Sequence, residues 1–226
     1  MRKTVQIGEK LKKVVPDINL STEITLQLEA YLDLLFQWNQ KINLTAIRDR
    51  QEMVVKHICD TAVSLSISSF AKILNDPGIR CIDFGSGAGI PGIILAICCP
   101  NIKLFSIDKS KKKIAFQEQV VRSLKLTNVY PRAVRLQDLT AGDIPQIAFN
   151  LIISRAFDQI KNILYFGEQF LQPDGSLILW KGESWKEELD QVDEKLLKHF
   201  TVVCSHRYEF RNEHHGGVLL HIRKNS

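Results

Sequence analysis

The residues best suited to chemistry form a glycine-rich segment, DFGSGAGIPG, which runs from Asp83 to Gly92. The mostly apolar residues 81–84 predict a short buried strand that leads into it, and a helix is expected from Ile90 onward. Glycines at such a turn let the backbone approach a ligand closely, because no Cβ intervenes. Asp108 ends the next predicted strand, where a carboxylate can accept hydrogen bonds from both ribose hydroxyls of an adenosine group. The segment and Asp108 together predict an adenosine-containing cofactor.

Two cofactor classes fit this segment. Residues 87–92 match the G-x-G-x-x-G pattern of dinucleotide-binding proteins. Gly85, Gly87 and Gly89, preceded by Asp83, match the pattern typical of methyltransferases that use S-adenosylmethionine. The carboxylate of Asp83 can reach the ammonium group of that cofactor, whereas it would repel a pyrophosphate. We therefore favour S-adenosylmethionine, and a dinucleotide-dependent oxidoreductase remains the alternative.

The elements around the segment alternate between strands and helices. Strands are predicted at residues 81–84, 104–108, 129–134, 151–154 and 177–180, with helices from 90, at 111–124, up to 170 and at 185–198. Two late strands, 201–209 and 218–223, are expected to pair with each other. Pro131 has no backbone N–H, so its strand is expected at an edge of the sheet. The predicted fold class is α/β, a Rossmann-like class I S-adenosylmethionine-dependent methyltransferase sheet with a helical N-terminal segment.

The first third of the chain is predicted to be helical. Apolar residues recur at helical spacing between 24 and 36, Ser21 suits the N-cap, and a second helix is expected at 51–65. The Asn-Asp-Pro-Gly turn at 75–78 marks a boundary. We therefore divide the chain into a helical segment, 1–74, on the substrate side, and a cofactor-binding methyltransferase domain, 75–226.

Composition excludes several classes of protein. Apolar residues make up 45% of the 226 residues, which is enough for a core and too many for a disordered chain. No apolar run approaches the roughly 18–20 residues of a membrane span, and the start lacks the apolar stretch of a signal peptide, so a cytoplasmic protein is expected. The five cysteines form no C-x-x-C pair, so we expect buried thiols and no metal site. The net charge of +5 permits a polyanionic partner.

Longer motifs resemble the RsmG (GidB) family, bacterial enzymes that methylate N7 of a guanine in the 530 loop of 16S (small-subunit) ribosomal RNA. The similar motifs are WNQKINLTAI at 38–47, KHICDT at 56–61, the glycine segment with its IPG extension, SRA at 154–156 and LWKG at 179–182. The similarity covers nearly the whole chain. It implies S-adenosylmethionine as cofactor and small-subunit ribosomal RNA as partner, and we expect a monomer.

The resemblance places the family's cofactor contacts on Gly85, Ile90, Leu136, Gln137 and Arg155, and its strand-two acid on Asp108. Gln137 departs from the glutamate that is usual there, although an amide can still donate and accept hydrogen bonds near an adenine ring. Lys109 also replaces a usual serine. The complete predicted cofactor set comprises Asp83, Gly85, Gly87, Gly89, Ile90, Asp108, Leu136, Gln137 and Arg155.

Guanine N7 carries an in-plane lone pair and no hydrogen, so it can attack a methyl group without first losing a proton. The enzyme then needs alignment more than a general base, and alignment can lower a barrier by up to roughly 7–11 kcal/mol. Arg155 is the predicted catalytic residue, because a guanidinium can hold the cofactor's carboxylate or the O6 and N7 edge of guanine. The structural alternative is an ion pair between Arg155 and Asp158 or Asp138.

Four further residues are candidate substrate contacts: Asn39, Asn43, His57 and Lys181. For His57 a structural role within a helix is favoured, and Lys181 is equally suited to a phosphate contact or to plain solvation. The His214-His215 pair lies in a polar segment without further metal ligands, so we expect a substrate contact or an ordinary loop.

Basic residues and tryptophans can add RNA contacts, although charge runs are usually solvated and tryptophans often belong to the core. These residues are Arg48, Arg50, Lys56, Lys109, Lys111, Lys112, Lys113, Trp38, Trp180 and Trp185. The alternatives to RNA methylation are a methyltransferase for a small molecule or protein side chain, and a non-catalytic RNA-binding module.

Overall fold

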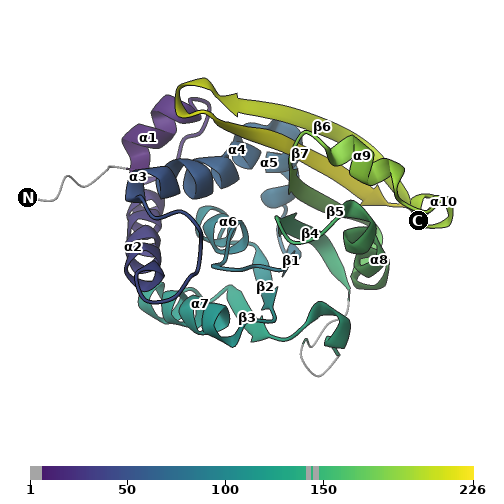
Figure 1. Cartoon of the computed structure of the whole chain (residues 1–226), viewed down its shortest axis with the longest axis horizontal. Coiled ribbons are helices and arrows are strands. Elements are labelled where there is room, and N and C mark those ends of the chain that lie inside the picture. The colour runs from purple at the N-terminus through teal and green to yellow at the C-terminus, as the bar shows by residue number, and fades with distance from the viewer. Residues whose placement is uncertain (1–6, 141–143, 145–147) are drawn as a thin grey trace, which may run out of the picture.

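The computed structural model describes residues 7–140, 144 and 148–226 and has a seven-stranded sheet at its centre (Figure 1). The strand order is β3-β2-β1-β4-β5-β7-β6. The first five strands in this order run parallel, while β7 is antiparallel to both β5 and β6. The predicted α/β class is thereby confirmed, and Pro131 lies in β3 at the sheet edge, as expected from its missing N–H.

The strands bring distant residues to one edge of the sheet. Their bounds are β1 Arg80–Phe84, β2 Lys103–Asp108, β3 Val129–Ala133, β4 Phe149–Arg155, β5 Leu171–Lys181, β6 Phe200–Phe210 and β7 His215–Lys224. Phe84 pairs with Ile107 on one side and with Ser154 on the other. The carboxyl ends of these parallel strands therefore align, and ligands of open α/β sheets bind at such an edge.

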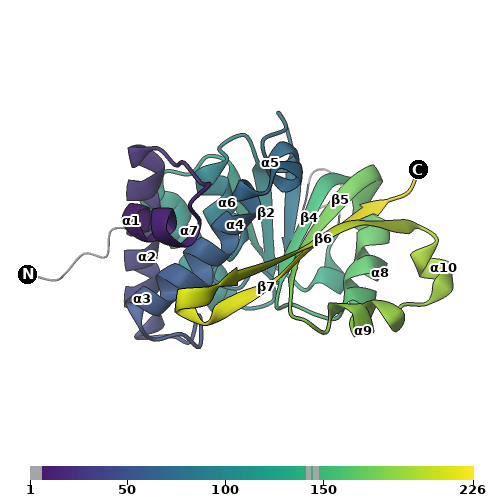
Figure 2. The same cartoon turned by 90° about the horizontal axis from the view of Figure 1, so that it is seen from above.

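Helices cover both faces of the sheet (Figure 2). On one face lie α1 Ile7–Val14, α2 Thr22–Asn39, α3 Arg50–Met53, the π-helix η1 Val54–Cys59, α4 Asp60–Ser66, α5 Ser68–Leu74, α6 Gly92–Cys98 and α7 Lys111–Leu124. On the other lie α8 Ile160–Phe170, α9 Trp185–Asp190 and α10 Glu194–Leu197. Successive strand residues face opposite sides: Cys81 packs in the first core and Ile82 in the second.

Several predicted elements differ from the structure. The single helix expected at 185–198 is wrong, because Val192 is buried between α9 and α10 and the Asp193 side chain caps α10 by accepting from the Lys195 N–H. The strand expected at 177–180 begins earlier, at Leu171, and Asp174 within it adopts a φ of +60°. The helix expected at 51–65 is continuous but contains the π-helical turn η1. Helices α1 and α5 lie within the predicted helical segment, 1–74, although their individual bounds were not predicted.

The N-terminal helices support the glycine segment directly. Ser21 caps α2 as predicted, with its Oγ accepting from the Ile24 N–H at 3.2 Å. Further along α2, the buried Tyr31 hydroxyl donates to the carbonyl of Ala88 at 2.9 Å. Tyr31 and Trp38 also pack their rings against Phe116 of α7. Residues 7–74 thus share one hydrophobic core with a face of the sheet.

Asp83 lies beneath the glycine segment, out of contact with solvent. Its Oδ2 accepts from the Gly92 N–H at 3.1 Å, and no hydrogen bond to Oδ1 is found within the described residues. Burial raises the pKa of Asp83 to about 8, since the single backbone donor only partly compensates for the lost hydration. The carboxyl is therefore largely protonated at neutral pH.

This raised pKa predicts a specific pH dependence of stability. Folded Asp83 keeps a proton that the unfolded chain releases above its ordinary pKa of 3.8, so its stabilising contribution is complete below that pH and is lost as the pH rises through about 8. The Asp83→Asn variant lacks this titration. We expect the difference in unfolding free energy, wild type minus variant, to fall steadily between roughly pH 5 and 8 in urea titrations. A difference that stays constant would mean that Asp83 does not titrate there.

Candidate active site

Two pockets adjoin at the carboxyl edge of the sheet and share a wall formed by Ala156, Phe157 and Asp158. The first, here called the Asp108 pocket, has a volume of about 430 Å³. The second, the Asp60 pocket, has a volume of about 580 Å³. Both volumes lie within the range of about 300–1,000 Å³ that is usual for small-molecule sites. Ala156 adopts a φ of +51°, a strained value for a side chain with a Cβ, and such strain often marks functional segments.

The Asp108 pocket joins the glycine segment to the end of β2. Asp108 accepts from the Gly87 N–H through Oδ2 at 2.9 Å and from the Ser110 N–H through Oδ1 at 2.8 Å. These two bonds fix the carboxylate while it still lines the pocket. Leu136 and Gln137, in the 3₁₀ turn Leu136–Asp138, line the opposite wall. An acidic group, backbone turns and an apolar wall suit an adenosine group.

Gly85 shows why the segment needs glycine. Its φ is +68°, and a Cβ added there would lie 2.1 Å from the ring of Phe157. A side chain at this position would therefore be strained by the backbone and would also push Phe157 out of the wall between the pockets. The loop backbone can approach a ligand at this point only because residue 85 has no side chain.

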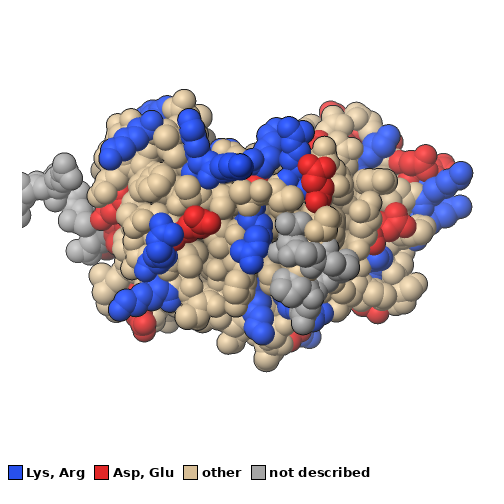
Figure 3. Space-filling view, turned by 90° about the horizontal axis from the view of Figure 1, so that it is seen from below, with Lys and Arg blue, Asp and Glu red and all other residues tan. Residues whose placement is uncertain are grey.

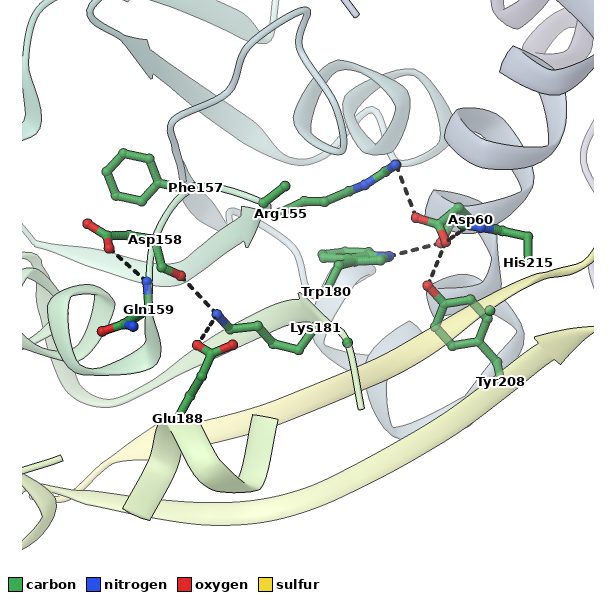
Figure 4. A pocket seen from close by; sticks show the side chains of 13 residues that line it. Asp60, Arg155, Phe157, Asp158, Gln159, Trp180, Lys181, Glu188, Tyr208 and His215 are labelled. Carbon is green, nitrogen blue, oxygen red and sulfur yellow. Dashed lines mark hydrogen bonds and ion pairs between the residues drawn. The ribbon is translucent and has the colours of Figure 1, made fainter. Parts of the chain in front are cut away.

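The Asp60 pocket is organised around one carboxylate (Figure 4). Oδ1 of Asp60 accepts from the Tyr208 hydroxyl at 2.6 Å and from Nε2 of His215 at 2.7 Å. Oδ2 forms an ion pair with Nη1 of Arg155 at 3.0 Å. The indole N–H of Trp180 donates to the main-chain carbonyl of Asp60 at 2.9 Å. Residues from β4, β5, β6 and β7 thus converge on Asp60 at the start of α4.

The Asp60 carboxylate stays ionised although it is only 4% exposed. Burial alone would raise its pKa, but the hydrogen bonds from His215 and Tyr208 and the charge of Arg155 outweigh burial, so the pKa of Asp60 lies below its ordinary value. Burial, together with the Asp60 charge, raises the pKa of Tyr208, so the phenol keeps its proton and donates. The cluster is therefore a stable carboxylate surrounded by donors.

A second ion pair lies on the opposite side of this pocket. Nζ of Lys181 contacts Oε2 of Glu188 at 2.5 Å and donates to the carbonyl of Asp158 at 2.8 Å. The Ile160 N–H donates to the same glutamate oxygen at 3.0 Å. Lys181 is therefore engaged with the protein, and its predicted role as a phosphate contact stays a prediction.

The predicted cofactor residues fall into two groups. Gly85, Asp108, Leu136 and Gln137 line the Asp108 pocket, and Gly87 contacts it by bonding Asp108. Asp83, Gly89, Ile90 and Arg155 do not line it. Arg155 instead lines the Asp60 pocket, and the partners considered for it in a structural role, Asp158 and Asp138, are wrong because its guanidinium pairs with Asp60.

Three of the predicted substrate residues lie outside both pockets. Asn39 is buried and holds the turn after α2, since its amide donates to Ile47 and accepts from Leu44 and Thr45. Asn43 is exposed and accepts from Arg48. His57 is buried in η1, and its Nε2 lies 3.1 Å from the hydroxyl of Thr45. Burial lowers the pKa of His57 to about 4, so its ring is neutral.

The cluster of Asp60, Tyr208 and His215 was not predicted from the sequence. Asp60 stood within the KHICDT motif, and His215 stood within the histidine pair, so a signal was present for two of the three. No motif in the sequence pointed to Tyr208.

Four of the five cysteines are buried, Cys204 is half-buried, and none is paired. Among residues 7–140, 144 and 148–226, no group of three or more His, Cys, Asp or Glu side chains is arranged to hold a metal ion, and no helix there is long and apolar enough to span a membrane.

Known proteins resemble this chain in fold. A SAM-dependent methyltransferase from Aquifex aeolicus matches with a TM-score of 0.53 at 15% identity, covering 70% of this chain and 88% of that one. The ribosomal protein L11 methylase from Lactobacillus delbrueckii subsp. bulgaricus matches with a TM-score of 0.53 at 14% identity, covering 79% and 80%. At such identities the likeness concerns the fold, which is that of class I methyltransferases.

Sequence comparison gives the family. Ribosomal RNA small subunit methyltransferase G of Methylobacillus flagellatus is 36% identical over 186 residues, covering 82% of this chain and 85% of that protein. The protein of the same name from Chromohalobacter salexigens is 32% identical and covers 95% and 96%. The model of the GidB family, described as rRNA small subunit methyltransferase G, matches residues 24–215. The predicted family, enzyme class and cofactor are thereby confirmed, and the chain belongs to the rRNA small subunit methyltransferase G family of S-adenosylmethionine-dependent methyltransferases.

Proposed function

We propose that this protein transfers a methyl group from S-adenosylmethionine to N7 of a guanine in the 530 loop of small-subunit ribosomal RNA. The observation that carries the proposal is the pair of adjoining pockets. One presents the acid suited to a ribose, the other presents Arg155, and residues 156–158 separate them. A cofactor in the Asp108 pocket and a base in the Asp60 pocket would meet across this short wall. Family membership supplies the class of RNA substrate.

The residues of the Asp108 pocket fit the cofactor. S-adenosylmethionine supplies an electrophilic methyl group on a sulfonium sulfur. Asp108 is already fixed by the Gly87 and Ser110 N–H groups, so its carboxylate can accept from ribose hydroxyls without reorganising. Leu136 gives the adenine an apolar wall, and the amide of Gln137 can bond its edge. We also propose that the cofactor contacts four residues that do not line this pocket in the structure, namely Asp83, Gly89, Ile90 and Arg155.

The residues of the Asp60 pocket suit a base that needs no deprotonation. The Asp60 carboxylate is covered by Tyr208, His215 and Arg155, so it is not free to act as a general base. A guanidinium can donate to O6 of guanine, and Trp180 offers an aromatic wall. Arg155 is therefore the residue that we assign to orienting the base. Alignment of N7 with the methyl group is the main contribution of the site.

The surface carries many basic side chains. Figure 3 shows one face of the molecule, over which Lys and Arg side chains are spread from left to right with Asp and Glu side chains among them, and the net charge of the chain is +5. Such a surface would follow an RNA backbone. We include in the proposal that residues 1–74 form part of the RNA-binding side, that Asn39, Asn43, His57 and Lys181 contribute to it, and that the protein acts as a monomer in the cytoplasm.

The decisive test is mass spectrometry of nucleosides from small-subunit ribosomal RNA incubated with the protein and S-adenosylmethionine. We expect 7-methylguanosine at one position of the 530 loop. Methylation of a small molecule or a protein side chain with unmodified RNA would contradict the proposal. A second reaction with the cofactor replaced by NADH checks the oxidoreductase alternative.

Asp108→Ala is expected to weaken binding of S-adenosylhomocysteine. Charge-assisted hydrogen bonds contribute about 1.5–3 kcal/mol, so the dissociation constant should rise roughly ten- to hundredfold in isothermal titration calorimetry. Asp76→Ala, in the exposed turn at the opposite end of the strands, is the matched control and should bind as the wild type does. Equal affinities of the two variants would show that Asp108 does not hold the ribose.

The rate of methyl transfer is expected to change little with pH. N7 is unprotonated at neutral pH, Asp60 stays ionised because its pKa is lowered, and His57 is neutral, so these groups do not titrate in the working range. Under single-turnover conditions with saturating RNA and cofactor, the rate should be nearly level between roughly pH 6.5 and 8.5. Saturating cofactor keeps the site filled, so a change in cofactor affinity caused by titration of Asp83 would not alter the measured rate. A tenfold rise per pH unit would instead reveal a general base, and it would favour a target atom that carries a proton.

A further inference from the structure

We propose that Asp60 is a positioning residue of this active site and that its buried carboxylate holds the guanidinium of Arg155 in the pocket that receives the target base. The inference rests on the proposed function, because it assigns the Asp60 pocket to the base. It goes further by naming the group on which the orientation of Arg155 depends. Asp60 itself is covered by protein and does not touch the base.

Both the main chain and the side chain of Asp60 are held in place. It follows the π-helix η1 and begins α4, and π-helical turns occur frequently at functional sites. Its carbonyl accepts from the indole of Trp180 across 120 residues of sequence. Its Oδ1 accepts from Tyr208 and His215 of the C-terminal hairpin. The carboxylate therefore has little freedom to rotate.

The two carboxylate oxygens have separate partners. Because Tyr208 and His215 both bond Oδ1, Oδ2 is left for Arg155. Nη1 of Arg155 is buried, and no aligned hydrogen bond from it is found among the described residues. The 3.0 Å ion pair with Oδ2 therefore compensates for the lost hydration of this group. The Arg155 side chain is 19% exposed and lines the pocket. One end of the guanidinium is thus held while the side chain still presents donors to the cavity.

The direction of Arg155 also depends on this pair. In Figure 4 the side chain extends away from Phe157 and Asp158 and points toward Asp60. A buried guanidinium without a counter-ion turns toward solvent or another acceptor, because an unpaired charge is costly in a low-dielectric site. Loss of the Asp60 charge would therefore move the donors of Arg155 without altering the Asp108 pocket, which Asp60 does not line.

The test compares full-length Asp60→Asn, Arg155→Lys and the double variant in methylation of small-subunit ribosomal RNA. A lysine cannot copy the planar fork of arginine, so Arg155→Lys should lower kcat. We expect Asp60→Asn to lower kcat at least tenfold, with the affinity for S-adenosylhomocysteine within twofold of wild type. The double variant should be no slower than the slower single variant, because Asp60 acts through Arg155. Asp76→Asn is the matched control and should behave as the wild type does.

Several outcomes would overturn the inference. Wild-type kcat in a folded Asp60→Asn variant would do so, and so would multiplied losses in the double variant or an equal loss of cofactor affinity. If Asp60→Asn does not unfold cooperatively, Asp60→Glu decides instead: it keeps the charge but displaces the carboxylate by one methylene, so a folded variant with wild-type kcat would contradict the positioning role. Absence of methylation by the wild type would overturn the proposed function itself, whereas an active wild type with an unaffected Asp60 variant overturns only the inference.

Discussion

A carboxylate withdrawn from water must be neutralised by its surroundings, and the architecture around Asp60 meets this requirement. Three side chains, from β4, β6 and β7, supply the donors and the positive charge. If any one of these strands were displaced, a buried charge would lose a partner, which is among the costlier defects in a folded protein. The N-terminal helices, the parallel sheet and the C-terminal hairpin are therefore linked by electrostatics as well as by apolar packing.

The same constraint explains why the two pockets differ in character. Asp108 is fixed by backbone N–H groups from its own turn and from the glycine segment, and its pocket is lined mainly by the segments that follow the parallel strands β1 to β4. The Asp60 pocket is built from side chains that meet only after the whole sheet has formed. The cofactor side thus needs the parallel strands and the loops that follow them, whereas the substrate side also needs the C-terminal hairpin.

The sequence was informative wherever a structural rule acts over a short distance. The strand, glycine turn and following acid identified the edge of the sheet, Pro131 identified the edge strand, and the repeat of apolar residues identified α2 and α7. The prediction of one helix at 185–198 was wrong because Val192 packs into the core and Asp193 starts a new helix, and this N-cap residue was the local signal of the break. The structure buries the carboxyl of Asp83. The predicted contact between Asp83 and the cofactor stays a prediction.

The Asp60 cluster could not be predicted because its members are far apart in the chain. Tyr208 lies 148 residues from Asp60 and His215 lies 155 residues from it, and no periodicity relates such positions. Arg155 was identified as important through its place after β4, yet its partner was not, because the nearby acids Asp158 and Asp138 are equally plausible by spacing. Only the register of β7 between β5 and β6 brings the histidine to the aspartate.

The sheet order has a consequence for the order of events on a translating ribosome. β6 is made before β7, but it contacts the rest of the sheet only through β7, which pairs with β5. A nascent chain that ends before His215 already contains every residue that lines the Asp108 pocket, the last of which is Phe166. It leaves Asp60 without two of its donors and β6 without a partner. Domains fold largely from the N-terminus during synthesis, so the capacity to hold a cofactor precedes the capacity to hold a base, and the latter appears only with the last strand.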